Sequence, residues 1–213
     1  AAVSLETRSL GDNLVTQSAA LLYLLGQWLW PGALNADPVL PVFSGWSAAW
    51  IGSILLCLGL AGWGFRAWWW KQAEAGWFGF AILWFGVHLA PTNSLLPRLD
   101  IANERHLYLA GAGLCMAGAL WARKWALRYP LLVPAGAAAI VLALAMLTHQ
   151  RNEVYRDEIA FWQDVVTKSP DNGRAHNNLG HAYATAGNAA GALDAYDQSI
   201  RLAPADYKAR LNR

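Results

Sequence analysis

Apolar residues fill the first part of the chain in long runs, which are separated by short segments containing proline, glycine or charged residues. A helix rises about 1.5 Å per residue, so about 20 apolar residues cross a hydrocarbon core of about 30 Å. The pattern predicts five membrane-spanning helices, at residues 13–30, 43–65, 76–90, 106–121 and 131–147. The first run begins with a polar turn, so a helix lying partly in the membrane interface is the alternative there.

Beyond residue 148 the apolar runs give way to helical periodicity with polar turns, which predicts a domain boundary. We expect an all-α protein, with a polytopic transmembrane helix bundle at 1–148 and a soluble α-solenoid at 149–213. Within the second domain, a unit of 34 residues at 173–206 has the spacing of the tetratricopeptide repeat. The matching residues are Leu179, Gly180, Tyr183, Gly187, Ala192, Tyr196, Ser199 and Pro204.

Residues 156–168 fit the second helix of a preceding repeat, and residues 207–213 fit the start of another. Since about three repeats are usually needed for a stable array, we expect further repeats, or cover from the membrane domain or a partner.

Four polar side chains of the predicted repeats are candidates for peptide binding. Asn177, Asn178 and His181 lie on the first helix of the unit, and Asn212 occupies the position equivalent to Asn178 one repeat later. An amide offers both a donor and an acceptor to an extended peptide backbone. The alternative is an ordinary solvated polar surface.

Composition agrees with a chain that lies partly in lipid. Of 213 residues, 56% are hydrophobic and only 14% are charged, against about a quarter in ordinary soluble domains. A formal net charge of +2 does not indicate a nucleic-acid partner.

Cys57 and Cys115 both lie in apolar runs and form no disulfide framework or metal-ligand spacing. No signal peptide is visible after Ala1, so we expect a piece of a longer chain.

The distribution of Lys and Arg in the short loops predicts the orientation in the membrane. The second loop carries Arg66 and Lys71, and the fourth carries Arg123, Lys124 and Arg128, whereas the first carries neither Lys nor Arg. Since basic residues are retained on the cytoplasmic side, the second and fourth loops are predicted there. The first loop, the third loop and the C-terminal region then lie on the outer side.

The third loop, at residues 91–109, is the strongest candidate for chemistry. It carries Arg98, Asp100, Glu104 and Arg105 between two apolar runs. A low-dielectric neighbourhood strengthens the attraction of such groups for a charged ligand or for one another. The alternative is a loop whose charges pair locally and snorkel to the interface.

Three sequence elements carry a family resemblance: Thr16-Gln17 with Tyr23 and Trp30-Pro31, then HLAPTNSLLP at 88–97, then NERHLYL at 103–109. Together with the repeat motif, they make the chain similar to the transmembrane and tetratricopeptide repeat proteins. Animal members of that family are protein O-mannosyltransferases of the endoplasmic reticulum lumen. The resemblance covers nearly the whole chain, but it corresponds only to the later half of the family's membrane domain and its first repeats.

The resemblance implies a GT-C glycosyltransferase architecture, in which a sugar passes from a polyprenyl-phosphate carrier to a protein hydroxyl at the outer face. In that chemistry an acidic residue of the first outer loop acts as general base or metal ligand, and that loop belongs to a part of the family not matched here. No catalytic residue is therefore named, no cofactor is expected within this chain, and a divalent metal is expected only in a full-length enzyme. This chain alone is expected to be inactive.

The resemblance also assigns roles to residues of the third loop. Arg105 and Arg98 suit the lipid-linked phosphate, because a guanidinium presents a fork of donors and keeps its charge. Glu104 would orient Arg105 or a neighbouring hydroxyl, Tyr108 would close the site, and Asn93 belongs to the same motif. The alternative for Glu104 and Tyr108 is simple packing.

Two functions follow as hypotheses. The first is a membrane glycosyltransferase-like protein whose partners are membrane lipid, a polyprenyl-phosphate sugar and an acceptor polypeptide recruited by the repeats. The second is a non-catalytic, membrane-anchored repeat scaffold within a larger complex. The Ala-, Gly- and Trp-rich composition and compact loops favour a bacterial inner-membrane protein with its repeats in the periplasm.

Overall fold

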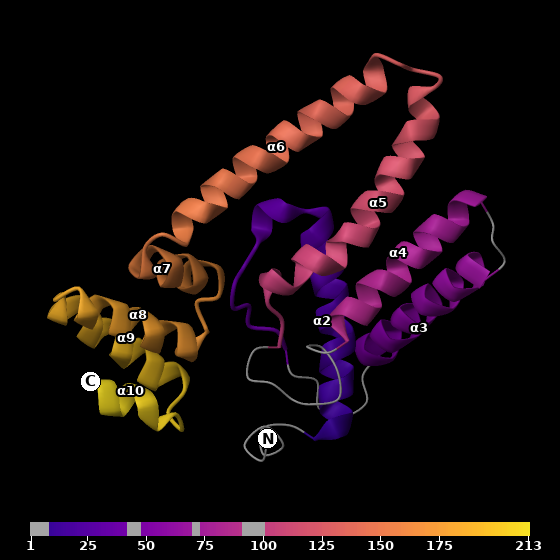
Figure 1. The fold of residues 1–213 in the computed structure, drawn as a ribbon. Coiled ribbons are helices and arrows are strands. Elements are labelled where there is room, and N and C mark those ends of the chain that lie inside the picture. The colour runs from indigo at the N-terminus through magenta and orange to yellow at the C-terminus, as the bar shows by residue number, and fades with distance from the viewer. Residues whose placement is uncertain (1–8, 42–47, 70–72, 91–100) are drawn as a thin grey trace. The chain divides into compact units, whose positions relative to one another are not determined.

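The computed structural model describes residues 9–41, 48–69, 73–90 and 101–213, and every regular element in those ranges is a helix (Figure 1). The chain divides into two compact units. Unit 1 comprises the described residues of Ala1–Leu34 and Leu40–Ala143, and unit 2 comprises Asn35–Val39 and Leu144–Arg213. Residue 148, where the sequence predicts a domain boundary, lies within a continuous helix, α6 (Leu132–Val154).

A helix forms at each of the five places where the apolar pattern predicts one. These helices are α2 (Leu10–Leu29), α3 (Ala48–Trp69), α4 (Ala73–Leu89), α5 (Leu107–Ala126) and α6 (Leu132–Val154). Within the described residues, Ile51–Trp69 and Leu132–Val154 are long and apolar enough to cross a membrane, and Ala75–Leu89 is a shorter apolar helix. The prediction of five spans is therefore supported in part, by two candidate helices judged on length and composition.

Helices α5 and α6 end later than the apolar pattern predicts. Helix α5 continues past residue 121 to Ala126, and α6 continues past residue 147 to Val154. The last turn of α5 contains Arg123 and Lys124, and the last turn of α6 contains Arg151. Cations are favourable at the negative C-terminal end of a helix dipole, so these helices continue beyond their apolar stretches.

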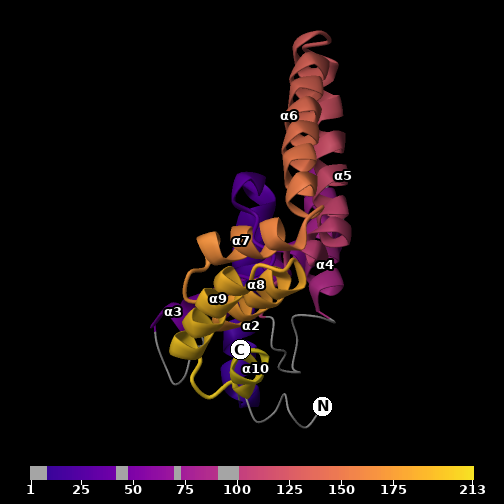
Figure 2. The ribbon, with the colours of Figure 1, turned by 90° about the vertical axis from the view of Figure 1, so that its left-hand side faces the viewer.

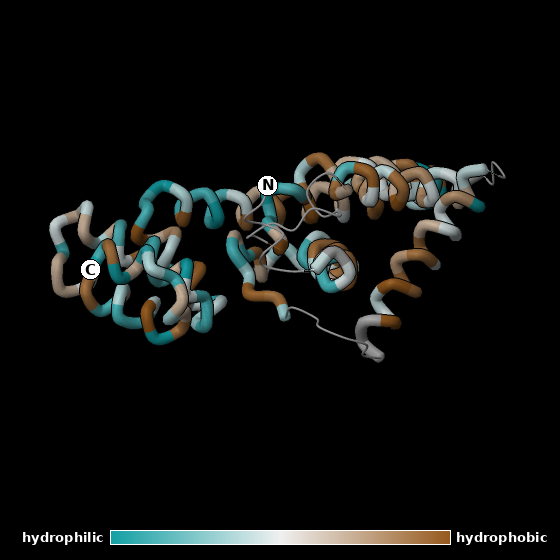
Figure 3. The backbone as a smooth tube through the Cα atoms, turned by 90° about the horizontal axis from the view of Figure 1, so that it is seen from below, coloured by the Kyte–Doolittle hydropathy of each residue, from teal (hydrophilic) through white to brown (hydrophobic). Residues whose placement is uncertain are grey.

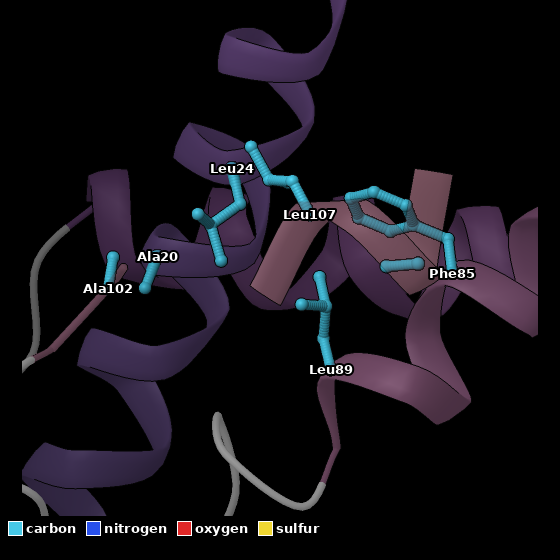
Figure 4. Packing of buried hydrophobic residues seen from close by; sticks show 7 residues of the cluster. Ala20, Leu24, Phe85, Leu89, Ala102 and Leu107 are labelled. Atoms are coloured by element: carbon cyan, nitrogen blue, oxygen red, sulfur yellow. The ribbon is translucent and has the colours of Figure 1, made fainter. Parts of the chain in front are cut away.

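The core of unit 1 is formed by α2, α4, α5 and the segment leading into α5. Figure 4 shows Leu24, Leu89, Leu107 and Phe85 converging from these elements. Among the described residues, the buried cluster comprises Ala20, Leu24, Phe85, Leu89, Ala102, Leu107 and Ala110.

Glycines allow the helices of unit 1 to approach closely. A Cβ added to Gly111 of α5 would lie 2.6 Å from Cδ1 of Trp28, and one added to Gly113 would lie 2.8 Å from Cδ1 of Trp84. The indole Nε1 of Trp84 donates a hydrogen bond of 2.9 Å to the carbonyl oxygen of Leu109. Small residues permit the same kind of contact between helices in lipid, where backbones must come close to pack.

Unit 2 contains α7 (Glu158–Lys168), α8 (Gly173–Thr185), α9 (Ala189–Leu202) and the short α10 (Tyr207–Asn212). Each begins at a capping side chain, which accepts a hydrogen bond from a backbone N–H of the first turn. The caps are Asp157, Asn172, Asn188 and Asp206. Hydrophilic residues recur through the helices next to the C-terminus, in contrast to long apolar stretches elsewhere (Figure 3).

Helices α8 and α9 form an antiparallel pair within the predicted repeat at 173–206 (Figures 1 and 2). The ring of Tyr196 covers Gly180, where an added Cβ would lie 2.6 Å from the ring. The hydroxyl of Ser199 donates a hydrogen bond of 2.7 Å to the carbonyl oxygen of Gly173. Gly187 has a φ of +78° in the connection, a conformation that glycine adopts readily.

An ion-pair network joins the end of α6 to α7. Nη1 of Arg151 lies 2.5 Å from Oδ2 of Asp164, and Nζ of Lys168 lies 2.8 Å from Oδ1. Burial alone would raise the pKa of the Asp164 carboxyl, but hydrogen bonds and charge from Lys168 and Arg151 hold this pKa below its ordinary value of 3.8. The network therefore favours the ionised carboxylate.

The Gly111–Trp28 contact can be tested with two equivalent substitutions in α5. Gly111→Ala should lower the free energy of unfolding by up to about 2 kcal/mol, because an overpacking cost of about 1–3 kcal/mol is offset by a helix-propensity gain of only about 1 kcal/mol. Gly118→Ala is the control, since a Cβ there meets nothing within 4 Å. Thermal unfolding of the detergent-solubilised chain measures both, and equal melting temperatures would contradict the packing argument.

The Asp164 network predicts a pH-dependent stability. Because the folded-state pKa is lowered, the stabilisation is complete above the unfolded-state pKa of about 3.9 and is lost as pH falls through the folded-state pKa. Asp164→Asn should therefore destabilise unit 2 by about 1 kcal/mol at pH 7, with the difference from wild type shrinking below about pH 4. Hydrogen exchange of α7 measures the effect, and Asp194→Asn, an exposed change on α9, is the control. A difference independent of pH would show that the carboxylate charge is not responsible.

Candidate functional site

The described part of the third loop ends in a short 3-10 turn, η2 (Glu104–His106), which leads directly into α5. The side-chain oxygen of Asn103 accepts a hydrogen bond of 3.1 Å from the backbone N–H of Arg105. This contact fixes the backbone of residues 103–105 at the start of α5. Arg105 is thereby held close to the N-terminal, positive end of that helix, where anions are favoured.

The structure places three of the five predicted lipid-phosphate residues, in contrasting surroundings. Glu104 is buried with 6% of its surface exposed, Arg105 is exposed, and Tyr108 is 79% exposed. Arg98 and Asn93 lie outside the described residues. Arg105 therefore lies at the surface of unit 1, while Glu104 belongs to its interior.

Two residues of α2 bring polar groups to the interior where Glu104 lies. Tyr23 interacts electrostatically with Glu104. Gln27 Nε2 donates a hydrogen bond of 2.6 Å to the hydroxyl of Tyr23 and one of 3.1 Å to the carbonyl oxygen of Ala33. The half-buried phenol of Tyr23 and the buried amide of Gln27 are thus hydrogen-bonded to each other within reach of the charge of the buried Glu104. Gln27 was not predicted as a functional residue, although Tyr23 and Gln27 are polar side chains four residues apart in an apolar run, which is a visible signal.

Helix α2 turns its polar face inward. Asn13, Thr16 and Gln17 are each at most 2% exposed, and their spacing places them on one face. Leu14 and Leu29, in contrast, are 48% and 66% exposed. A soluble helix shows the opposite pattern, so this arrangement favours an apolar environment outside unit 1 and explains why α2 is not apolar along its whole length.

The candidate peptide-binding residues of unit 2 lie on α8 and α10. Asn177 is buried at 8% exposure, and its side-chain oxygen accepts a hydrogen bond of 3.1 Å from Nδ2 of Asn212. Asn178 is half-buried and His181 is exposed. The structure therefore brings Asn177 and Asn212 together as an internal contact, and it leaves Asn178 and His181 as the more accessible members of the predicted group.

Within the ranges that the structure describes, no three His, Cys, Asp or Glu side chains come close enough to hold a metal ion. These residues offer no ligand set from which a metal-dependent step can be derived.

No family model matches the chain, and no solved structure matches it. A curated relative is Protein O-mannosyl-transferase Tmtc3 of Drosophila melanogaster, to which the chain is 30% identical over 128 residues. The matched region covers 58% of this chain and 14% of that protein, so the chain spans about a seventh of the relative's length.

Proposed function

We propose that this chain is part of a membrane protein glycosyltransferase that transfers a sugar from a polyprenyl-phosphate carrier to a protein hydroxyl. The observation that carries the proposal is the 30% identity over 128 residues to an O-mannosyl-transferase. The two candidate membrane helices within the described residues support a membrane location.

We extend this proposal to the arrangement in the membrane. Helices α2 to α6 would be five spans, with η2 and unit 2 on the outer side, and the membrane would be the bacterial inner membrane with the repeats in the periplasm. The inward polar face of α2, at Asn13, Thr16 and Gln17, supports a lipid-exposed exterior for a helix of mixed composition. The helix pair α8–α9 would be one unit of a tetratricopeptide-repeat solenoid, as supported by the contact between Tyr196 and Gly180.

In this mechanism Arg105 binds the lipid-linked phosphate. During transfer the bond between sugar C1 and the phosphate oxygen breaks, the acceptor oxygen bonds to C1, and the acceptor's proton passes to a base that these residues do not supply. Negative charge accumulates on the departing phosphate, and a guanidinium placed beside it stabilises that charge. The exposure of Arg105 and its place at the start of α5 support this role. Arg98 and Asn93 belong to the same proposed site, with Glu104 and Tyr108 shaping it.

The repeats would recruit the acceptor polypeptide through Asn178 and His181, while Asn177 and Asn212, which are bonded to each other, would support that surface from below. Asn178 lies next to the Asn177–Asn212 contact, which orders the neighbouring turns of α8 and α10. A side-chain amide held on an ordered helix can pair with both the N–H and the C=O of an extended peptide.

A membrane-anchored scaffold without catalytic activity is the second candidate. Tyr207 and Leu211 of α10 are 69% and 79% exposed, which favours contact with a further protein surface. Sugar-transfer measurements on the natural protein separate the two functions, because a scaffold produces no labelled acceptor.

The role of Arg105 can be tested in the natural protein, reconstituted in membranes with radiolabelled polyprenyl-phosphate mannose. Arg105→Ala should lower turnover about 10- to 100-fold, because a charge-assisted hydrogen bond contributes about 1.5–3 kcal/mol. The turnover of Arg105→Lys should lie between that of wild type and that of Arg105→Ala, since Lys keeps the charge but loses the fork of donors. Arg123→Ala, at the opposite end of α5, should leave turnover unchanged. Unchanged carrier binding and turnover in Arg105→Ala would remove Arg105 from the site.

The role of Asn178 can be tested by acceptor-peptide binding. Asn178→Ala should weaken binding about 5- to 10-fold through the loss of about 1 kcal/mol of hydrogen bonding, with no change in the melting temperature of unit 2. Gln198→Ala, which removes a half-buried amide from α9, is the matched control. Equal peptide affinity in wild type and Asn178→Ala would leave Asn178 as ordinary surface.

A further inference from the structure

Five residues that precede α3 in the chain, Asn35–Val39, fold as part of unit 2. The carboxylate of Asp37 is held by both arms of one guanidinium, with Arg174 Nε donating to Oδ2 at 3.0 Å and Nη2 donating to Oδ1. The Asp37 side chain is 10% exposed. A two-point contact of this kind recognises a planar carboxylate by shape as well as by charge.

The connection between α7 and α8 supplies further contacts to this segment. Nδ2 of Asn172 donates a hydrogen bond of 2.9 Å to the Asp37 carbonyl oxygen. The hydroxyl of Ser169 accepts hydrogen bonds from Nδ2 of Asn35, at 2.9 Å, and from the backbone N–H of Val39, at 3.3 Å. The segment is therefore recognised through its main chain and through two of its side chains.

One of the binding groups, Asn172, is also held by a contact within unit 2 that does not involve the segment. Oδ1 of Asn172 caps α8 by accepting a hydrogen bond of 3.0 Å from the backbone N–H of Ala175, which aims its Nδ2 at Asp37. The segment is shaped by its own contact, since the backbone N–H of Asp37 donates to Oδ1 of Asn35 at 3.2 Å. A turn of this type is a local property of an Asn whose side-chain oxygen accepts from the backbone N–H two residues later.

An apolar contact lies beside the polar ones. Ala36 is 5% exposed and belongs to the core of unit 2, together with Val165, Val166, Ala175, Leu179 and Ala195. The polar partners Ser169 and Asn172 are also buried, at 7% and 8% exposure. Buried polar groups are costly when their partners are removed, so this surface is built to be covered by a matching ligand.

We propose that the α7–α8 end of unit 2 is a binding site for an acidic turn segment of the pattern Asn-Ala-Asp-Pro, and that Asn35–Val39 is its ligand in cis. Arg174 binds the Asp side chain of the segment, and Ser169 and Asn172 bind its turn. The small apolar side chain of Ala36 packs into the core of unit 2. Release of Asn35–Val39 opens the site to an acidic segment of the same pattern. This proposal does not depend on sugar transfer.

The experiment uses the full chain in detergent and a fluorescent peptide with the sequence of residues 33–41. In wild type, the tethered segment competes at an effective concentration on the order of millimolar, so the peptide binds weakly. Asp37→Ala should bind the peptide at least 10-fold more tightly, because its own segment no longer competes. Adding Arg174→Ala to that variant should abolish the gain, and a peptide with Asn in place of Asp should not bind either variant.

Asp171→Ala is the matched control, because it removes an exposed acid from the same connection. It should bind the peptide as weakly as wild type does. The proposal is overturned if wild type and Asp37→Ala bind the peptide equally, or if Arg174→Ala leaves peptide binding to the Asp37→Ala chain unchanged.

Hydrogen exchange gives a second measurement that needs no peptide. The backbone N–H groups of Asp37 and Val39 are hydrogen-bonded and should be protected in wild type, with exchange at least 10-fold faster in Arg174→Ala. The charge-swapped chain, Asp37→Arg with Arg174→Asp, should recover part of this protection. Such recovery would show that Arg174→Ala loses the ion pair rather than the fold of unit 2. Rapid exchange of both groups in wild type would overturn the proposal.

Discussion

Gly111 and Gly113 have no side chains, and this allows α2 and α4 to approach α5 closely. Trp28 and Trp84 occupy the space that side chains at those positions would fill. Because α5 begins directly after η2, the same contacts hold the start of the helix that follows Arg105. The position of the candidate phosphate-binding residue therefore depends on two close helix approaches, and tight packing of this kind tolerates little additional volume.

A second constraint is the need to pair polar groups away from water. In unit 1 the inward face of α2 carries Asn13, Thr16 and Gln17, and Gln27 bonds to Tyr23 and Ala33 beside Glu104. The two hydrogen bonds of Gln27 restrict how α2 packs, because losing either would leave a buried polar group without that partner. The hydrogen bonds of Gln27 thus favour one packing arrangement in a core whose other contacts are mostly between apolar side chains.

The sequence predicted where helices occur better than where they end or what they bury. Apolar runs gave the places of α2 to α6, and the repeat spacing gave α8 and α9, since both signals are local and periodic. The ends of α5 and α6 were missed, because Arg123 and Arg151 extend helices whose apolar stretch is already finished. The burial of Asn177 and Glu104 was not predictable from residue type, which favours exposure for both. The pairing of Asp37 with Arg174 has no local signal at all.

The Asp37–Arg174 contact also bears on biosynthesis. The two residues are separated by 137 positions, so the ribosome produces the acidic segment long before its partner emerges. The free-energy cost of closing a chain loop grows only with the logarithm of its length, and the intervening helices shorten the effective loop further. Helices α3 to α6 can thus form before this closure. The joining of Asn35–Val39 to α8 must wait until α8 itself has been synthesised.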